Sequence, residues 1–164
     1  MAVCEFLTLA GIDNNPKIKP DGKYGIDFLY IHVIRIGVDV EVKEKWGSSS
    51  WPKKWKTVHI VNRKLKNLNM VGIKFDVLEF WVLNKSLTTA VIIKGDTFKK
   101  SVVKRIECHS ENYTGPDDIR DILFSQVDRI CHLETGITEY LENPYKENKN
   151  SYAQLSLPLL YWNE

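Results

Sequence analysis

The hexapeptide Val-Asp-Val-Glu-Val-Lys at positions 38–43 constrains the fold more than any other stretch of the chain. Its strict alternation predicts a β-strand with three valines on one face and Asp39, Glu41 and Lys43 on the other. On an edge strand such a charged face is ordinary and is usually solvated. The segment also lies within a longer β-rich stretch, which we expect to span residues 26–45.

A second acid precedes this strand. Asp27 lies in the apolar sequence Gly-Ile-Asp-Phe-Leu-Tyr. If residues 26–43 form an antiparallel hairpin with its tip near Ile34, Asp27 lies directly opposite Glu41 on the same face. Two carboxylates placed so closely repel each other unless a cation lies between them, and Mg²⁺ prefers oxygen ligands. The pattern therefore predicts a metal site whose bound water is the nucleophile, with Lys43 beside that water or a phosphate.

This order of residues resembles the signature of the PD-(D/E)XK, or restriction-endonuclease-like, nucleases, which have an acid, a spacer and Glu-x-Lys at the end of a β-hairpin. Here it reads Asp27…Glu41-Val42-Lys43, and similar features in KYGIDF, WKTVHIVNRK and FWVLNKSLTTAVII extend it over more than half of the chain. The resemblance implies a DNA endonuclease that uses Mg²⁺, or Mn²⁺ in its place, and that forms a homodimer to cut both strands. It implies catalytic roles for Asp27, Glu41, Lys43 and Glu5, with Asp27, Glu41 and the main-chain carbonyl of Val42 as metal ligands.

Two other acids compete for these roles. Pro20-Asp21 spells the literal "PD", but it lies in a polar turn rather than on an apolar strand, so we prefer Asp27. Asp39 shares the face of Glu41, and we interpret it as a neighbour of the site.

A basic segment follows the proposed catalytic lysine. Between Lys43 and Lys66 there are eight Lys and Arg residues against one acid, Glu44. Three tryptophans, at positions 46, 51 and 55, alternate with the lysines there. Cations neutralise phosphates and aromatic faces stack on bases, so this segment indicates DNA contact, although packing in the core is the competing interpretation for each tryptophan. The expected nucleic-acid-binding residues are Lys53, Lys54, Lys56, Arg63 and Lys64.

Composition limits the class of protein. The 164 residues fit one domain, residues 1–164, and 43% hydrophobic content excludes a disordered chain. No apolar run reaches the ~20 residues of a membrane helix, and the first residues do not resemble a signal peptide. Three cysteines suit a reducing cytoplasm. The Lys- and Asn-rich chain, without low-complexity segments, suits a prokaryotic or phage-encoded protein. The Cys108-His109 and Cys131-His132 pairs lack zinc-site spacing, and Cys131 is more simply a buried thiol.

The remaining patterns predict an α/β fold, with a central mixed β-sheet flanked by helices as in the restriction endonucleases. Residues 2–10 form a short helix or a strand, and strands are expected at 57–61, 75–83, 89–93 and 101–108. An amphipathic helix is expected to begin at Pro116, because apolar residues recur at helical spacing from Ile119 to Cys131. A last strand is expected in LSLPLLYW.

The alternative from another class is a non-catalytic nucleic-acid-binding or toxin-neutralising interaction module on a related fold. The enzyme interpretation requires the Asp27 and Glu41 carboxylates to lie within ~4–6 Å of each other at a cleft, the range over which charges perturb each other's pKa, and it fails if they face opposite sides of the sheet.

Overall fold

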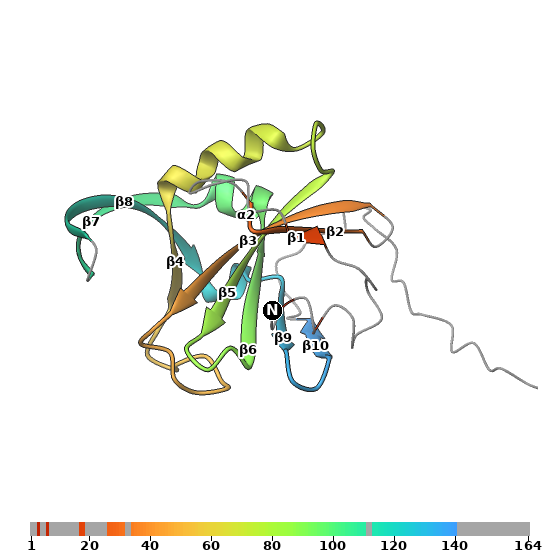
Figure 1. The fold of residues 1–164 in the computed structure, drawn as a ribbon. Coiled ribbons are helices and arrows are strands. Elements are labelled where there is room, and N and C mark those ends of the chain that lie inside the picture. Colours follow the sequence, from red (N-terminus) through yellow and green to blue (C-terminus); the bar gives the residue numbers. More distant parts are fainter. Residues whose placement is uncertain are drawn as a thin grey trace, which may run out of the picture.

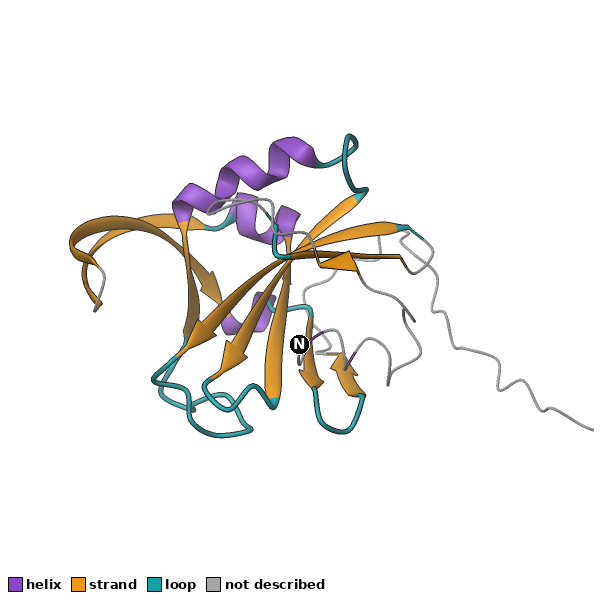
Figure 2. Cartoon of the chain, in the orientation of Figure 1, coloured by secondary structure: helices purple, strands orange, loops and turns teal. Residues whose placement is uncertain are grey.

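Strands dominate the computed structural model, which describes residues 3, 6, 17–18, 26–31, 34–110 and 113–140 (Figure 2). They form a seven-stranded and a three-stranded sheet. The larger sheet has the order β1 (Lys17–Ile18), β2 (Phe28–Ile31), β3 (Arg35–Lys43), β5 (Val77–Asn84), β6 (Thr89–Lys94), β9 (Arg129–His132) and β10 (Ile137–Tyr140). The smaller sheet has the order β4 (Thr57–Val61), β8 (Tyr113–Leu123) and β7 (Val102–Ser110).

The helices are short. Those whose bounds lie within the described residues are the 3₁₀ helix η2 (Asn62–Met70), the α-helix α2 (Gly95–Lys100) and the 3₁₀ turn η3 (Phe124–Gln126). Figure 1 shows η2 in yellow across one end of the strands. The predicted helix-flanked α/β fold of the restriction endonucleases is therefore wrong, because the chain is mostly β and its large sheet curls into a half-barrel. Among the described helices, none has the length and apolar composition needed to cross a membrane.

The large sheet is mixed because β3 pairs antiparallel with β2 and parallel with β5. The strands predicted at 57–61, 75–83, 89–93 and 101–108 are confirmed as β4, β5, β6 and β7. Strand β5 reads as a nearly continuous apolar run, as expected for a strand buried on both faces. Of residues 2–10 the structure describes only Val3 and Phe6, which are helical and buried, and the LSLPLLYW segment lies outside the described residues.

The helix predicted from Pro116 onward is wrong. Residues 113–123 form β8, which pairs with β4 on one side and β7 on the other. The apolar residues Ile119 and Ile122 suit a helix face, but they are buried here as strand residues. Pairing with β4 covers only Ile119–Leu123, so Pro116 lies where β8 has one neighbouring strand and its missing N–H costs little. Tertiary pairing thus overrides the local helical pattern.

Two hydrophobic clusters cover the two faces of the large sheet. One lies under η2, α2 and the small sheet and includes Phe75, Phe80 and Phe98. The other includes Phe6 and Trp81. The second cluster also contains the buried Cys131 and Val38, with the partly buried Val40 packed against it, whereas Val42 is 40% exposed. The predicted buried thiol is therefore confirmed, and the valine face of β3 packs on the core at its first two positions.

Gly37 lets β3 approach Phe75. A Cβ atom at this position would lie 2.6–2.8 Å from three carbon atoms of the Phe75 ring, which is fully buried and cannot swing into solvent. We expect Gly37→Ala to lower the free energy of unfolding by about 1–3 kcal/mol through overpacking. Urea denaturation measures this difference. Gly47→Ala is the matched control, since no atom lies within 4 Å of its added Cβ, and equal midpoints for the two variants would contradict the close approach.

Candidate functional site

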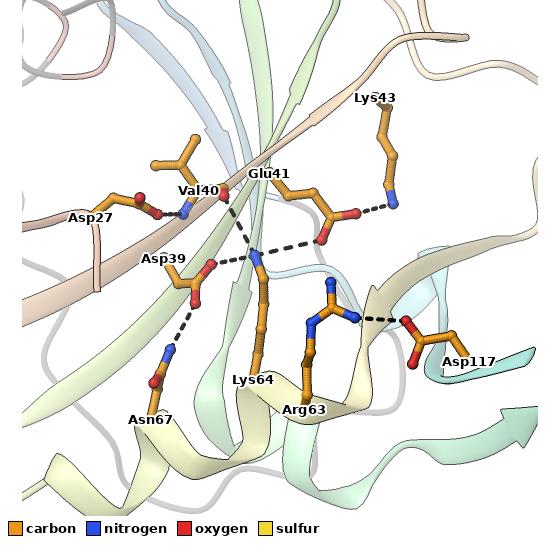
Figure 3. Close-up of polar contacts among 9 residues, drawn as sticks. All are labelled: Asp27, Asp39, Val40, Glu41, Lys43, Arg63, Lys64, Asn67 and Asp117. Atoms are coloured by element: carbon orange, nitrogen blue, oxygen red, sulfur yellow. Dashed lines mark hydrogen bonds and ion pairs between the residues drawn. The ribbon is translucent and has the colours of Figure 1, made fainter. Parts of the chain in front are cut away.

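The charged face of β3 points into the protein rather than into solvent. Asp39 and Glu41 lie beside the core residues Phe80 and Val82 in the parallel register with β5. Asp39 is only 3% exposed and Glu41 is partly buried. The predicted alternation is confirmed, but η2 covers the face that an ordinary edge strand would leave solvated (Figure 3).

The ammonium group of Lys64, on η2, lies at the centre of this face (Figure 3). It donates a short hydrogen bond to Oδ1 of Asp39, and it lies 3.4 Å from the carbonyl oxygen of Val40 and 3.6 Å from Oε2 of Glu41. Lys43 donates a second short bond to Oε1 of Glu41. Three oxygen atoms from consecutive residues of β3 therefore surround one cation position.

Asn67 completes the contact between η2 and β3. Its side-chain nitrogen donates to Oδ2 of Asp39 at 2.8 Å. Lys64 and Asn67 are three residues apart, and a 3₁₀ helix has three residues per turn, so both side chains leave η2 on the same side. Sequence analysis missed Asn67 and treated Lys64 as a DNA contact. Their spacing was the available signal, but nothing local to η2 shows which strand it faces.

Asp27 lies opposite Asp39, not opposite Glu41 as predicted. The hairpin of β2 and β3 is confirmed, but its register pairs Phe28 with Val38, which is a shift of two residues. The carboxylate of Asp27 accepts a hydrogen bond from the Val40 amide at 2.5 Å. A two-residue shift preserves the face, so the Asp27 and Glu41 side chains lie on the same side of the sheet, although Asp27 pairs with the Val40 amide and not across from Glu41.

The electrostatic balance of the cluster favours added positive charge. Burial raises the pKa of Asp39 above its ordinary value, and the nearby Asp27 charge raises it further, while Lys64 and the Asn67 hydrogen bond oppose the shift. Oε2 of Glu41 is buried and accepts no hydrogen bond among the described residues. The cluster thus places three carboxylates against two lysines and leaves one buried oxygen without a donor.

The donor set that could hold a metal ion is small. In the part of the chain that the structure describes, no three or more His, Cys, Asp or Glu side chains form a group suited to a metal. The oxygens that do converge belong to Asp39, Glu41 and the Val40 carbonyl. Val40 precedes the predicted carbonyl ligand, Val42, by two residues, and Glu5 lies outside the described residues.

The basic segment carries mostly exposed cations and three tryptophan rings that are buried or partly buried. Lys53, Lys54 and Lys56 are exposed, and Arg63 forms an ion pair with Asp117 at 2.8 Å. Lys64, by contrast, lies within the acidic cluster.

The tryptophans of this segment pack in the core. Trp46 is fully buried and donates its indole N–H to the Ser50 carbonyl. Trp51 makes edge contacts with both Trp46 and Trp55, and it stacks on Phe124 with 5.1 Å between the ring centroids. Base stacking by Trp46 is therefore a wrong interpretation, and core packing is confirmed for it.

A second buried polar cluster, on the other face of the sheet, contains Glu79, a carboxylate whose two oxygens both accept hydrogen bonds. Both oxygens of Glu79 accept hydrogen bonds from Arg129 at 2.8 Å, and one also accepts from Tyr30 and from Trp81. Burial raises the pKa of Tyr30 well above its ordinary value. Since every oxygen of Glu79 is satisfied, we interpret this cluster as structural, in contrast to Glu41.

Comparisons of the chain with protein-family models, with curated proteins and with solved structures gave no match. The function is therefore argued from the site itself.

Proposed function

We propose that the protein is a metal-dependent endonuclease that hydrolyses DNA phosphodiester bonds at the acidic cluster of β3. One observation carries the proposal: the Asp39 and Glu41 carboxylates and the Val40 carbonyl surround a single cation position, and Glu41 keeps a buried oxygen without a hydrogen bond. Hard oxygen donors of this kind suit Mg²⁺ or Mn²⁺. The resemblance of Asp27…Glu41-Val42-Lys43 to the PD-(D/E)XK signature supports the same class of chemistry.

Each residue of the cluster has a distinct role in this proposal. Asp39, Glu41 and the Val40 carbonyl hold the ion, and the exposed Asp27 adds negative charge at the rim. When bound, a divalent ion lowers the pKa of a coordinated water and stabilises negative charge on the phosphate. With an ion held by these oxygens, the Lys64 ammonium would be available to contact the phosphate. Lys43, held by Glu41, orients the attacking water.

Exposed cations of the basic segment supply the electrostatic contact with DNA in this proposal. Lys53, Lys54 and Lys56 lie on the connection between β3 and β4, and Arg63 adjoins Lys64 on η2. Neutralising phosphates with such residues releases counterions, so binding weakens as salt concentration rises. A dimer that cuts both strands is part of the same proposal.

One observation favours a second function, a non-catalytic interaction module. The Lys64 ammonium already provides a cation for the carboxylates. In that case the cluster only fastens η2 to the sheet, and the exposed lysines bind a nucleic acid or another acidic partner.

Cleavage of supercoiled plasmid DNA separates the two functions. The endonuclease produces nicked and linear DNA with Mg²⁺ or Mn²⁺ and none with EDTA, as followed on agarose gels. A structured RNA tested in parallel defines which nucleic acid is the substrate. Intact plasmid and RNA in both ions would contradict the endonuclease and favour the interaction module.

A further inference from the structure

The geometry points to a contact between two copies of this chain. We propose that β7 of one copy pairs antiparallel with β7 of a second copy, so that the two small sheets become one continuous sheet. The inference rests on the edge of the small sheet: it gives an interface to the dimer of the proposed function, but it does not require nuclease activity.

Strand β7 has a long free edge. It is nine residues long, and it lies at the end of the order β4, β8, β7, so β8 is its only partner strand in the described part of the chain. Figure 1 shows β7 and β8 arching together away from the rest of the molecule. Val102 and Val103, on opposite faces of this edge, are 63% and 46% exposed. An extended strand with unpaired backbone groups is a ready template for pairing with another chain.

The charges on β7 match those of a second copy of the same strand. Arg105 and Glu107 are two residues apart, so they share a face, and both are exposed. Across the pairing with β8, Arg105 lies opposite Asp118, and their charged groups are 3.8 Å apart. Glu107 lies opposite Pro116 and forms no ion pair among the described residues. Each copy therefore offers two opposite charges on one face of this edge: Arg105, which is loosely paired with Asp118, and Glu107, which forms no ion pair among the described residues.

One register uses these charges fully. If Ile106 lies opposite Ile106 of the second copy on a two-fold axis, Arg105 faces Glu107 of the second copy, and the reverse pair forms as well. Moving the two-fold axis by one residue along β7 gives the neighbouring symmetric registers. These place Arg105 opposite Arg105 of the second copy, or Glu107 opposite Glu107. Like charges directly opposite each other destabilise a strand pair, so the charge pattern selects the first register.

The test uses single and mixed charge variants in sedimentation velocity experiments over the micromolar range. The unmodified chain is expected to dimerise. Arg105→Glu makes both positions acidic, and Glu107→Arg makes both basic, so each variant alone should raise the dimer dissociation constant at least about tenfold. An equimolar mixture of the two variants should form a heterodimer, because every pair across the two strands is again of opposite charge.

The mixture is the decisive measurement. Both variants change exposed residues, and circular dichroism of each confirms that it is folded. Recovery of the dimer in the mixture supports pairing along β7 in the proposed register. A monomeric unmodified chain, a dimer unaffected by either single variant, or a mixture that stays monomeric would each overturn the proposal.

Discussion

Replacing Glu41 by glutamine is expected to reduce the rate of plasmid cleavage by at least about 100-fold. Removing a residue that only hydrogen-bonds to a metal ligand usually reduces activity by about 10- to 100-fold, and Glu41 is proposed to be a ligand itself. Glutamine keeps the size of the side chain but removes the charge that the proposed ion needs. The charged oxygen that accepts the Lys43 hydrogen bond also becomes part of a neutral amide. Initial cleavage rates over a range of Mg²⁺ concentrations measure the effect, and part of the loss should be recovered at high Mn²⁺.

Glu44→Gln is the matched control on the same segment. Glu44 is exposed and makes only a loose ion pair with Lys85 at 3.8 Å. Its substitution should leave cleavage unchanged. Equal cleavage by both variants and the unmodified chain would remove Glu41 from the proposed site.

Replacing Lys64 by alanine is expected to lower the free energy of unfolding by about 2–4 kcal/mol at neutral pH. The substitution leaves the buried Asp39 carboxylate and one oxygen of Glu41 without their ammonium partner. Urea denaturation measures the loss. Lys53→Ala, which removes an exposed lysine of the same basic segment, should change stability by no more than about 0.5 kcal/mol.

The destabilisation of Lys64→Ala should depend on pH. The pKa of Asp39 is already raised by burial, and removal of Lys64 takes away the charge that opposes this shift. Above the ordinary carboxyl pKa of 3.8, the native variant therefore binds more protons than the unfolded chain. Stability then falls as pH rises through this window, so the difference from the unmodified chain should be smaller near pH 4 than at pH 7. A difference independent of pH would contradict this account.

Divalent ions should stabilise the same variant. If the three oxygens around Lys64 can hold a metal, removal of the ammonium opens that position. An ion at 100 times its dissociation constant would then add about 2.7 kcal/mol to the stability of Lys64→Ala. Thermal unfolding with and without Mn²⁺ measures this, with Asp39→Asn in the same background as control. No shift in the melting temperature of Lys64→Ala would argue against the donor set.

The local part of this structure could be predicted from the sequence. Alternation at 38–43 predicts the strand and its two faces, because side chains on a strand must alternate. Apolar runs bounded by turn residues predict β4, β5 and β6. Each of these predictions depends on residues that are close together in the chain.

Predictions that depended on distant partners were the ones that failed. Residues 116–131 have a helical apolar pattern, but the first part of this segment pairs with β4 and β7 and forms the middle strand of a sheet. The tip of the hairpin of β2 and β3 contains no turn-specific residues that would indicate its register. The observed register places Asp27 opposite Asp39 rather than opposite Glu41. The cation of the candidate site comes from η2, and no pattern within η2 reveals that it folds onto β3.

Strands β3 and β5 run parallel, so the chain must cross over before they can pair. That crossover, residues 44–76, carries Lys64 and Asn67 on η2. Closing so long a loop costs entropy before any contact is gained, which makes this pairing a slow, non-local step of folding. The hairpin of β2 and β3 alone presents hydrated, mutually repelling carboxylates, and it receives its lysine only when the crossover closes. We therefore expect the candidate site to form late in folding, together with the non-local pairing of β3 and β5.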